Sequence, residues 1–413
     1  MHSTGPRAAP LAGLRVLDLS RVLAGPWAAQ LLGDLGADVV KIERPGSGDD
    51  TRAWGPPHLL DREGTSTGEA AYFLCANRNK RSITIDLAST EGQGLVRQMA
   101  QQADVLLENF KPGGLAQYGL DAPRLLALNP RLVVCSITGF GQTGPYAERG
   151  GYDFLIQGMG GLMSLTGRAE GEPGAGPQKV GVALTDIMTG LYAANAVQAA
   201  LIERERSGLG QHIDLALLDV QVAALANQAS SYLCVGEVPR RLGNAHPTIV
   251  PYQDFPTADG DMILAIGNDG QFSRFCDAAG HPEWATDARY QTPAQRVANR
   301  DTLIPLIAEA TQQRTTRAWV AMLEPVSVPC GPINGLDEVF ADAQVRSRGV
   351  RIEMPHPTAG TVPLVANPMR LSGSPVEYRR PPPLLGEHTR EVLTDWLGLT
   401  DLEIDGLRER RIL

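Results

Sequence analysis

Residues 14–42 read LRVLDLSRVLAGPWAAQLLGDLGADVVKI, and this stretch decides the fold class. Residues 14–19 and 38–42 are short apolar runs, each typical of a buried strand. Between them we expect a loop at residues 20–26 and a helix at residues 27–35, which ends at Gly36. A strand, a helix and a second strand in this order indicate a β-α-β unit of a parallel sheet.

The same alternation continues along the first half of the chain. Strands are predicted at residues 82–87, 105–108, 132–137 and 212–217, and helices at 91–103, 186–205 and 218–232. This rhythm predicts an α/β domain with a doubly wound parallel sheet. The first loop has no GxGxxG motif, so a nicotinamide or flavin site is not expected.

The pattern changes after about residue 235, where a smaller second domain is predicted. Residues 254–266 have the pattern of a hairpin with its turn at Ala258, Asp259 and Gly260, and helices are expected at 271–279 and 301–310. We therefore expect a large domain over residues 1–225 and a small α+β domain over 226–335. A Pro-rich extended linker at 379–385 and a last helix at 389–397 follow.

Composition narrows the possible functions. The chain has 37 basic and 46 acidic side chains, a balance that argues against a nucleic-acid partner. Five widely spaced cysteines without a CxxC pair favour a reducing compartment and give no zinc-site spacing. Residues 1–14 lack a long apolar segment, and no later run approaches the roughly 18 apolar residues of a membrane span. We expect a soluble cytoplasmic protein with no membrane partner.

Four loops rich in glycine and proline follow predicted strands and should meet at one edge of the sheet, where open α/β sheets bind ligands. They lie at residues 20–25, 43–48, 109–114 and 138–144. Arg21, Arg44, Asn109 and Lys111 belong to them. Each loop alone is best interpreted as a turn with solvated cations, whereas four at one edge favour a ligand crevice.

Asp186, in the segment GVALTDIMTG, is the most suggestive carboxylate because it lies where the long helix should begin. It could be a helix N-cap. It could also be a nucleophile that backbone N–H groups and the helix dipole keep ionised at pH 7. Position alone favours the cap. Residues 267–272, GNDGQF, are either a strand-to-helix turn or a lid that excludes water.

Seven segments together resemble the class III CoA-transferases of the CaiB/BaiF type, over residues 11–393. They are LAGLRVLDLSRVLAGPWAAQLLGDLGADVVKIERPGSGDDTR, NRNKRSITIDL, ENFKPGGL, SITGFGQTGP, GVALTDIMTG, RSGLGQHIDLAL and PPPLLGEHT. Within the family, GSGDDTRAWGPP and HPTIVPYQ most resemble the succinate–hydroxymethylglutarate branch.

The resemblance implies a Rossmann-like large domain built from both chain ends, with residues 336–413 as linker and return, around a smaller domain. It also implies an interlocked homodimer. No resident cofactor and no metal are expected, since CoA and acyl-CoA are substrates together with a carboxylic acid.

The resemblance further implies roles for residues of this chain. Asp186 falls on the nucleophile, and Tyr152 and Asp153 fall beside the active site. Expected CoA contacts are Leu23, Ala24, Arg44, Ile85, Asp86, Leu87, Ala88, Asn109, Phe110 and Lys111. The expected lid comprises Gly267, Asn268, Gly270 and Gln271. Leu23 replaces the glutamine of formyl-CoA transferases, so oxalate or formate chemistry is not expected.

The implied reaction moves CoA from an acyl-CoA such as succinyl-CoA to a dicarboxylate such as glutarate or hydroxymethylglutarate, through an aspartyl anhydride and thioester. The second carboxylate needs a cation. Arg21 is the first candidate, and Arg241, helped by His246, is the second. An ion pair of Arg21 with Asp49 or Asp50 is an equally good interpretation.

Two rival functions remain at this point. An α-methylacyl-CoA racemase would share the fold, but that branch of the family carries a histidine where this chain has Tyr152. A CoA-binding protein without catalysis would not need an aspartate at position 186.

Overall fold

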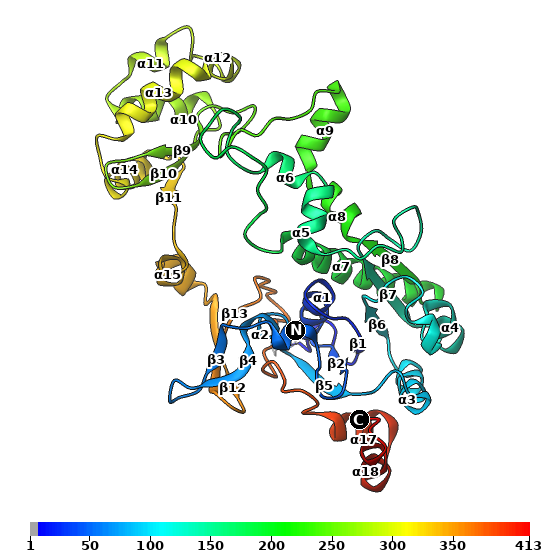
Figure 1. The fold of residues 1–413 in the computed structure, drawn as a ribbon. Helices are drawn as coiled ribbons and strands as arrows, with labels where there is room; N and C mark the ends of the chain where they lie inside the picture. The colour runs from blue at the N-terminus through cyan, green and yellow to red at the C-terminus, as the bar shows by residue number, and fades with distance from the viewer. Residues whose placement is uncertain (1–6) are drawn as a thin grey trace, which may run out of the picture. The chain divides into compact units, whose positions relative to one another are not determined.

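The computed structural model describes residues 7–413 and divides into two compact units (Figure 1). The large unit contains the residues up to Leu162, Val180–Ser230 and Gln344–Leu413. The small unit contains Met163–Lys179 and Ser231–Ala343. Residues 163–179, which fall inside the predicted first domain, therefore belong to the small unit. Both the N-terminal and the C-terminal parts of the chain contribute to the large unit.

A parallel sheet forms the centre of the large unit. Its strands are β1 (Arg15–Asp18), β2 (Asp38–Glu43), β5 (Lys80–Thr84), β6 (Val105–Glu108), β7 (Val133–Thr138) and β8 (His212–Ala216). Within the described residues their order is β5-β2-β1-β6-β7-β8, and every neighbouring pair is parallel. This is the doubly wound order of a Rossmann-like sheet, and the strand sequence reverses between β1 and β6.

Helices cover both faces of the sheet because neighbouring residues of each strand point to opposite sides. Val16 and Val39 pack with helices α1 (Ala24–Asp34) and α7 (Leu184–Ser207). Leu17 and Val40 face the other way. There they pack with helices α3 (Thr90–Ala100), α4 (Ala122–Leu128), α17 (Thr389–Leu397) and α18 (Asp401–Glu409). The α/β prediction from residues 14–42 is confirmed.

Several predicted elements have different bounds, among them helix α1, which begins at Ala24 inside the loop predicted at residues 20–26. Strand β5 begins at Lys80, two residues before the predicted start, because the charged side chains Lys80 and Arg81 are buried in ion pairs that a hydrophobic pattern does not show. The helix predicted at 218–232 is two helices, α8 (Leu217–Ala224) and α9 (Ala226–Val235). Ala226 has a positive φ of 44°, which interrupts the helix.

Smaller elements complete the large unit. They are η1 (Asp50–Ala53), β3 (His58–Leu60), β4 (Ser66–Ala70), α2 (Ala71–Leu74), η2 (Ala116–Tyr118), α5 (Asp153–Met159), β12 (Arg351–His356) and β13 (Gly360–Val365). Two short helices lie where the chain passes between the units: α6 (Leu162–Leu165), which belongs to the small unit after Leu162, and α16 (Ala343–Ser347), which belongs to the large unit after Ala343. The antiparallel hairpin β12–β13 was not expected from the sequence. Met354 and Val362 of this hairpin pack on Leu74 of α2, so the hairpin from the C-terminal part of the chain covers a helix from the N-terminal part.

A buried carboxylate joins the C-terminal segment to the N-terminal sheet. Asp34 is fully buried and accepts hydrogen bonds from the side chains of Arg78, Asn79 and Asn367. Asn79 also binds the predicted linker, because its Oδ1 accepts from the backbone N–H groups of Arg379 and Arg380. The C-terminal return of the chain is thus fixed by hydrogen bonds to charged and amide side chains.

The small unit is built around an antiparallel sheet of β9 (Tyr252–Pro256), β10 (Asp261–Ala265) and β11 (Cys330–Pro332). Its helices are α10 (Asp269–Ala279), α11 (Glu283–Thr286), α12 (Pro293–Ala298), α13 (Arg300–Thr311), α14 (Thr316–Leu323), η3 (Glu324–Val326) and α15 (Leu336–Ala341). The hairpin predicted at residues 254–266 is confirmed as β9–β10. Across residues 7–413, every helix is too short or too polar to cross a membrane.

Candidate active site

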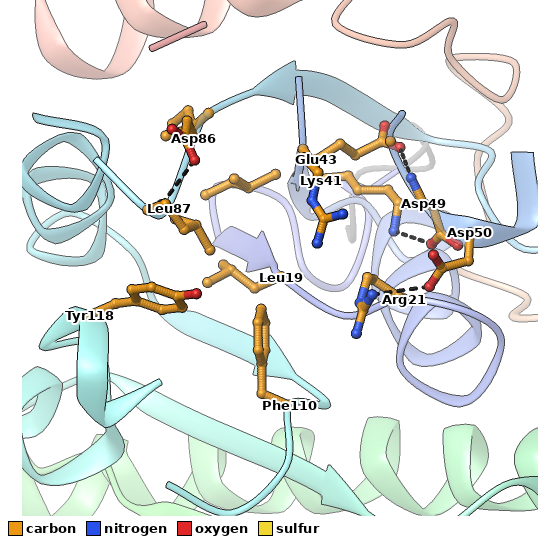
Figure 2. A pocket seen from close by; sticks show the side chains of 15 residues that line it. Leu19, Arg21, Lys41, Glu43, Asp49, Asp50, Asp86, Leu87, Phe110 and Tyr118 are labelled. Carbon is orange, nitrogen blue, oxygen red and sulfur yellow. Dashed lines mark hydrogen bonds and ion pairs between the residues drawn. The ribbon is translucent and has the colours of Figure 1, made fainter. Parts of the chain in front are cut away.

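A cavity of about 330 Å³ opens where the parallel strands end (Figure 2). Leu19 and Arg21 line it from the end of β1, and Phe110 lines it from the end of β6. These two strands flank the point where the strand order reverses, which is where doubly wound sheets bind ligands. Arg44 after β2 and Asp86 after β5 contribute from the neighbouring strands.

The cavity collects many of the predicted CoA contacts. Those that line it are Arg44, Ile85, Asp86, Leu87, Ala88 and Phe110. Tyr118, which the sequence did not single out, lies with Phe110 on one side of the space (Figure 2). Lys111 instead lines a separate cavity of about 90 Å³, together with Glu108, Ser136 and His212.

The buried charged side chains of Lys41, Glu43 and Asp49 line the cavity, and Lys41 is linked to the buried pair of Asp18 and Lys80, which does not line it. Nζ of Lys41 lies 2.9 Å from Oδ2 of Asp49 and 4.0 Å from Oδ2 of Asp18, and Nζ of Lys80 lies 2.8 Å from Asp18. Burial alone would raise the pKa of Asp49, but Lys41, together with the N–H and the hydroxyl group of Thr51, lowers it to about 2. Burial lowers the pKa of Lys80 to about 8. These pairings fix the loop after β2, which carries Asp49, against the sheet.

The loop between β1 and α1 connects the cavity with helix α7. Its end at β1 is held by Asn109, whose amide bonds both the N–H and the C=O of Arg21, at 2.9 and 2.7 Å. Val22 has a φ of +72°, which is strained for a β-branched residue. Ala24, buried like Leu23, then packs so closely on α7 that a Cβ at Gly190 would lie 2.8 Å from its carbonyl oxygen.

Arg21 forms the ion pair that was one of its two predicted roles. Its Nη1 lies 3.0 Å from Oδ2 of Asp50, and both side chains are about half exposed (43% and 53%). An exposed pair of this kind contributes at most about 1 kcal/mol. The guanidinium also lies near the ring of Phe110, 5.8 Å from its centroid. Arg21 therefore lines the cavity with a guanidinium group whose ion pair with Asp50 is weak.

Asp186 is not the N-cap of α7, which corrects the first interpretation of this residue. The N-cap is Ala183, whose methyl group cannot accept a hydrogen bond, and Asp186 is the third residue of the helix. Asp153 of α5 caps the helix instead. Its Oδ1 accepts from the backbone N–H of Thr185 at 2.8 Å and from that of Asp186 at 3.4 Å. The structure thus places Asp153 at the helix end that carries Asp186.

Asp186 is also less acidic than its place at a helix N-terminus predicts. Burial, followed by the negative charge of Asp153, raises the pKa of Asp186 from 3.8 to about 7. Only 9% of the residue is exposed, so the carboxylate loses water that the helix dipole does not replace. Near neutral pH the side chain is therefore a partly protonated, poorly solvated carboxyl group.

Tyr72, on the four-residue helix α2, is a neighbour of this site that sequence analysis missed. Burial and the charges of Asp186, Cys75 and Asp153 raise its pKa to about 12, so it stays a neutral hydroxyl group. Trp54 packs edge-on against its ring. A single tyrosine in the run AAYFLCAN gives no local signal. Tyr152, in contrast, is largely exposed (68%) at the N-cap position of α5.

The remaining predicted site residues belong to the small unit. Asn268 is the N-cap of α10 and accepts a hydrogen bond from the N–H of Gln271 at 2.9 Å. Oε1 of Gln271 accepts from the N–H of Gly267 at 2.8 Å, so the predicted lid is held by its own side chains, and Gly270 lies in the first turn of the helix. Arg241 pairs with Glu170 at 3.6 Å, and the ring of His246 lies edge-on to that of Tyr252.

Replacing Asp186 by asparagine is expected to stabilise the protein at alkaline pH. A folded-state pKa raised from 3.8 to about 7 means that stability is lost as the pH rises through this range, by up to about 4 kcal/mol. The amide side chain of the variant cannot ionise and avoids this loss. Urea unfolding of the Asp186→Asn variant should show a gain over wild type at about pH 8.5 that shrinks toward about pH 5.

Asp18→Asn is the matched control, because lysines hold the pKa of this buried carboxyl below its ordinary value against the effect of burial. That variant should be destabilised at neutral pH. An Asp186→Asn variant with the same stability difference from wild type at both pH values would contradict the burial of an uncompensated charge.

Known proteins match this chain over nearly its whole length. The family model described as CoA-transferase family III matches residues 11–389. A succinate–glutarate CoA-transferase from Agrobacterium fabrum is 52% identical over 94% of this chain and 96% of its own. The succinyl-CoA:glutarate CoA-transferase of Homo sapiens is 43% identical over 96% of this chain and 88% of its own.

Solved structures agree with these matches. A CaiB/BaiF family protein from Brucella suis is 50% identical and superposes with a TM-score of 0.83, over 94% of this chain and 100% of its own. The Rv3272 protein from Mycobacterium tuberculosis is 30% identical, with a TM-score of 0.81 over 94% of this chain and 99% of its own. Sequence and fold agree over nearly the whole length, and the chain belongs to CoA-transferase family III.

Proposed function

We propose that this enzyme transfers CoA from succinyl-CoA to glutarate or a similar dicarboxylate, with Asp186 as the nucleophile. The observation that carries the mechanism is a buried carboxyl group of raised pKa at the N-terminus of α7. The substrate pair rests on full-length relatives of 43–52% identity that are named for succinate and glutarate.

The first half of the reaction moves the acyl group onto the enzyme. The Asp186 carboxylate attacks the thioester carbonyl carbon of succinyl-CoA, the C–S bond breaks, and CoA leaves as a thiolate. The product is a mixed anhydride between Asp186 and succinate. The thiolate then attacks the aspartyl carbonyl, which releases succinate and leaves CoA as a thioester on Asp186.

The second half repeats these steps in the opposite direction. A carboxylate of glutarate attacks the aspartyl thioester, releases the CoA thiolate and forms an aspartyl–glutaryl anhydride. The thiolate attacks the glutaryl carbonyl, which gives glutaryl-CoA and restores the Asp186 carboxylate. Because water would destroy each intermediate, the site must exclude it, and we assign this role to the segment Gly267–Gln271.

Burial of Asp186 suits this chemistry. A carboxylate with a raised pKa is more basic than an ordinary aspartate, and attack on a carbonyl carbon benefits from that basicity. The cavity at the strand ends then receives CoA, with Arg44 and Phe110 as proposed contacts. The β1–α1 loop connects that cavity to α7, so one segment of the chain joins the proposed CoA site to the helix that carries the nucleophile.

We expect Asp186 to carry covalent intermediates. Incubation with succinyl-CoA and hydroxylamine should leave a hydroxamate on Asp186, detectable by peptide mass spectrometry. Asp186→Ala should lose transfer activity by at least about 10³-fold, because no other group replaces the nucleophile, and should still bind CoA. Substantial turnover by this variant would rule out the assignment.

We also propose that the enzyme prefers dicarboxylic acceptors and that an arginine binds the distant carboxylate. Arg21 is the first candidate because it lines the cavity and its pair with Asp50 is exposed. Arg241 is the second, since its Nε is buried without a hydrogen-bond partner among the described residues. A guanidinium binds a carboxylate through two parallel hydrogen bonds, which a lysine cannot reproduce.

Specificity constants for glutarate and butyrate test this proposal in wild type, Arg21→Lys and Arg241→Lys. The variant that lacks the correct arginine should lose about 2–4 kcal/mol of transition-state binding for glutarate and almost none for butyrate. Equal use of the two acids by wild type would refute the dicarboxylate preference. Equal losses for both acids in both variants would refute only the arginine assignment.

We further propose a homodimer of interlocked chains in the reducing cytoplasm, where the free cysteines of the structure would persist. Exposed apolar side chains on α7 and α9 support an interface between copies. They are Leu191, Tyr192, Ile202, Tyr232, Leu233 and Val235.

Interlocked chains separate only when they unfold, so sedimentation velocity should show a dimer that persists on dilution from micromolar to nanomolar concentration. A monomer at micromolar concentration would refute the dimer.

A further inference from the structure

Gln157 lies behind the carboxylate that caps α7. It belongs to α5, one turn after Asp153, and its side chain is completely buried. Its Nε2 donates to Oδ2 of Asp153 at 2.7 Å, while Oδ1 of the same carboxylate accepts from the N–H of Thr185. The two oxygens of Asp153 are therefore held from opposite sides, one by Gln157 and one by α7.

The other end of the Gln157 amide holds the chain that leads into α7. Oε1 accepts from the backbone N–H of Val180 at 2.9 Å, and Nε2 also approaches the carbonyl oxygen of Val182 at 3.4 Å. An amide rotated by 180° would place its oxygen against the Asp153 carboxylate and its NH₂ group against the N–H of Val180. Only the observed orientation satisfies both partners, so the amide is fixed.

We propose that Gln157 is a positioning residue for the nucleophile, acting through Asp153, an inference that rests on the proposed function. By binding Oδ2, it aims Oδ1 at the first N–H groups of α7, and by binding Val180 it fixes the segment that enters the helix. Asp186 follows Thr185 directly in the first turn. The position of its carboxyl group therefore depends on the cap that Gln157 holds in place.

Gln157 also keeps the negative charge of Asp153 beside Asp186. The Gln157 amide donates to Oδ2 of Asp153 and so holds this carboxylate at the start of α7. Asp153 from α5 and Tyr72 from α2 are the titratable groups that face Asp186 within the described residues, and the raised pKa of Tyr72 leaves it neutral. Trp27 from α1 and Gln221 from α8, which bonds Thr185, carry no charge. Asp153 is thus the charge that sets the ionisation of Asp186 beyond burial itself.

Substitution of Gln157 should change the pH dependence as well as the rate. In Gln157→Leu the Asp153 carboxylate is released on one side, and we expect kcat to fall about 10–100-fold with KM for succinyl-CoA nearly unchanged. The acid limb of the pH profile of kcat/KM should move to lower pH, since the negative charge of Asp153 moves away from Asp186. In Gln157→Glu an added carboxyl group lies beside Asp153, and the limb should move to higher pH.

A double-mutant cycle tests whether Gln157 acts through Asp153. Gln157→Leu should cost much less in an Asp153→Ala background than in wild type, because the carboxylate that Gln157 positions is then absent. Gln30→Leu is the matched control. Gln30 is a buried glutamine that likewise bonds two backbone groups, the carbonyl of Cys75 and the N–H of Arg78. Its loss should lower stability and leave the acid limb in place.

The inference is overturned if the losses multiply in the double variant, or if Gln157→Leu and Gln157→Glu leave the acid limb unmoved or shift it in the same direction. Gln157→Glu keeps the shape of the side chain and supplies this comparison if the leucine variant does not fold. Failure of the proposed function is distinguishable, because it would appear as turnover by the Asp186→Ala variant, in which Gln157 and Asp153 are intact.

Discussion

The hydrogen bonds from α7 to the carboxylate of Asp153 set the geometry of the site. Helix α7 begins at a residue without a capping side chain, so its first N–H groups depend on an acceptor from α5. The same carboxylate opposes the ionisation of Asp186. Stabilising the helix and destabilising the charged nucleophile are therefore two effects of one group. Because α7 also packs tightly on α1 at Gly190, this contact extends to the loop that borders the cavity.

Beneath the cavity, buried charges hold the strand ends where the ligand crevice forms. Asp18 of β1, Lys41 of β2 and Lys80 of β5 lie on three adjacent strands and are joined by ion pairs. Such groups add little net stability compared with apolar side chains, but removal of one partner leaves an uncompensated charge. These ion pairs tolerate few alternative arrangements, and they therefore hold the loops that carry Arg21 and Arg44 in fixed positions.

Local patterns predicted the sheet because the apolar residues in 14–42 have the spacing of a strand, then of a helix, then of a second strand. They misplaced the start of β5, where Lys80 and Arg81 are polar yet buried by partners distant in sequence. Many of the predicted CoA contacts meet in one cavity, since parallel strands end at one edge. The cap and the pKa of Asp186 were mispredicted for the same reason as β5. The cap is Asp153, which lies 33 positions earlier in the chain, and the pKa depends first on burial and then on Asp153, and both arise only in the folded structure.

A carboxylate that acts in turn as nucleophile and as leaving group needs an intermediate basicity. If Asp186 were as acidic as an exposed aspartate, it would attack the thioester slowly. If it were much more basic, it would remain protonated at neutral pH and leave the anhydride slowly. With a pKa of about 7, the ionised form is abundant and the acyl group can still transfer away. Burial provides most of this shift in pKa, and Asp153 provides the remainder. The carboxylate that caps α7 therefore also adjusts the basicity of the nucleophile.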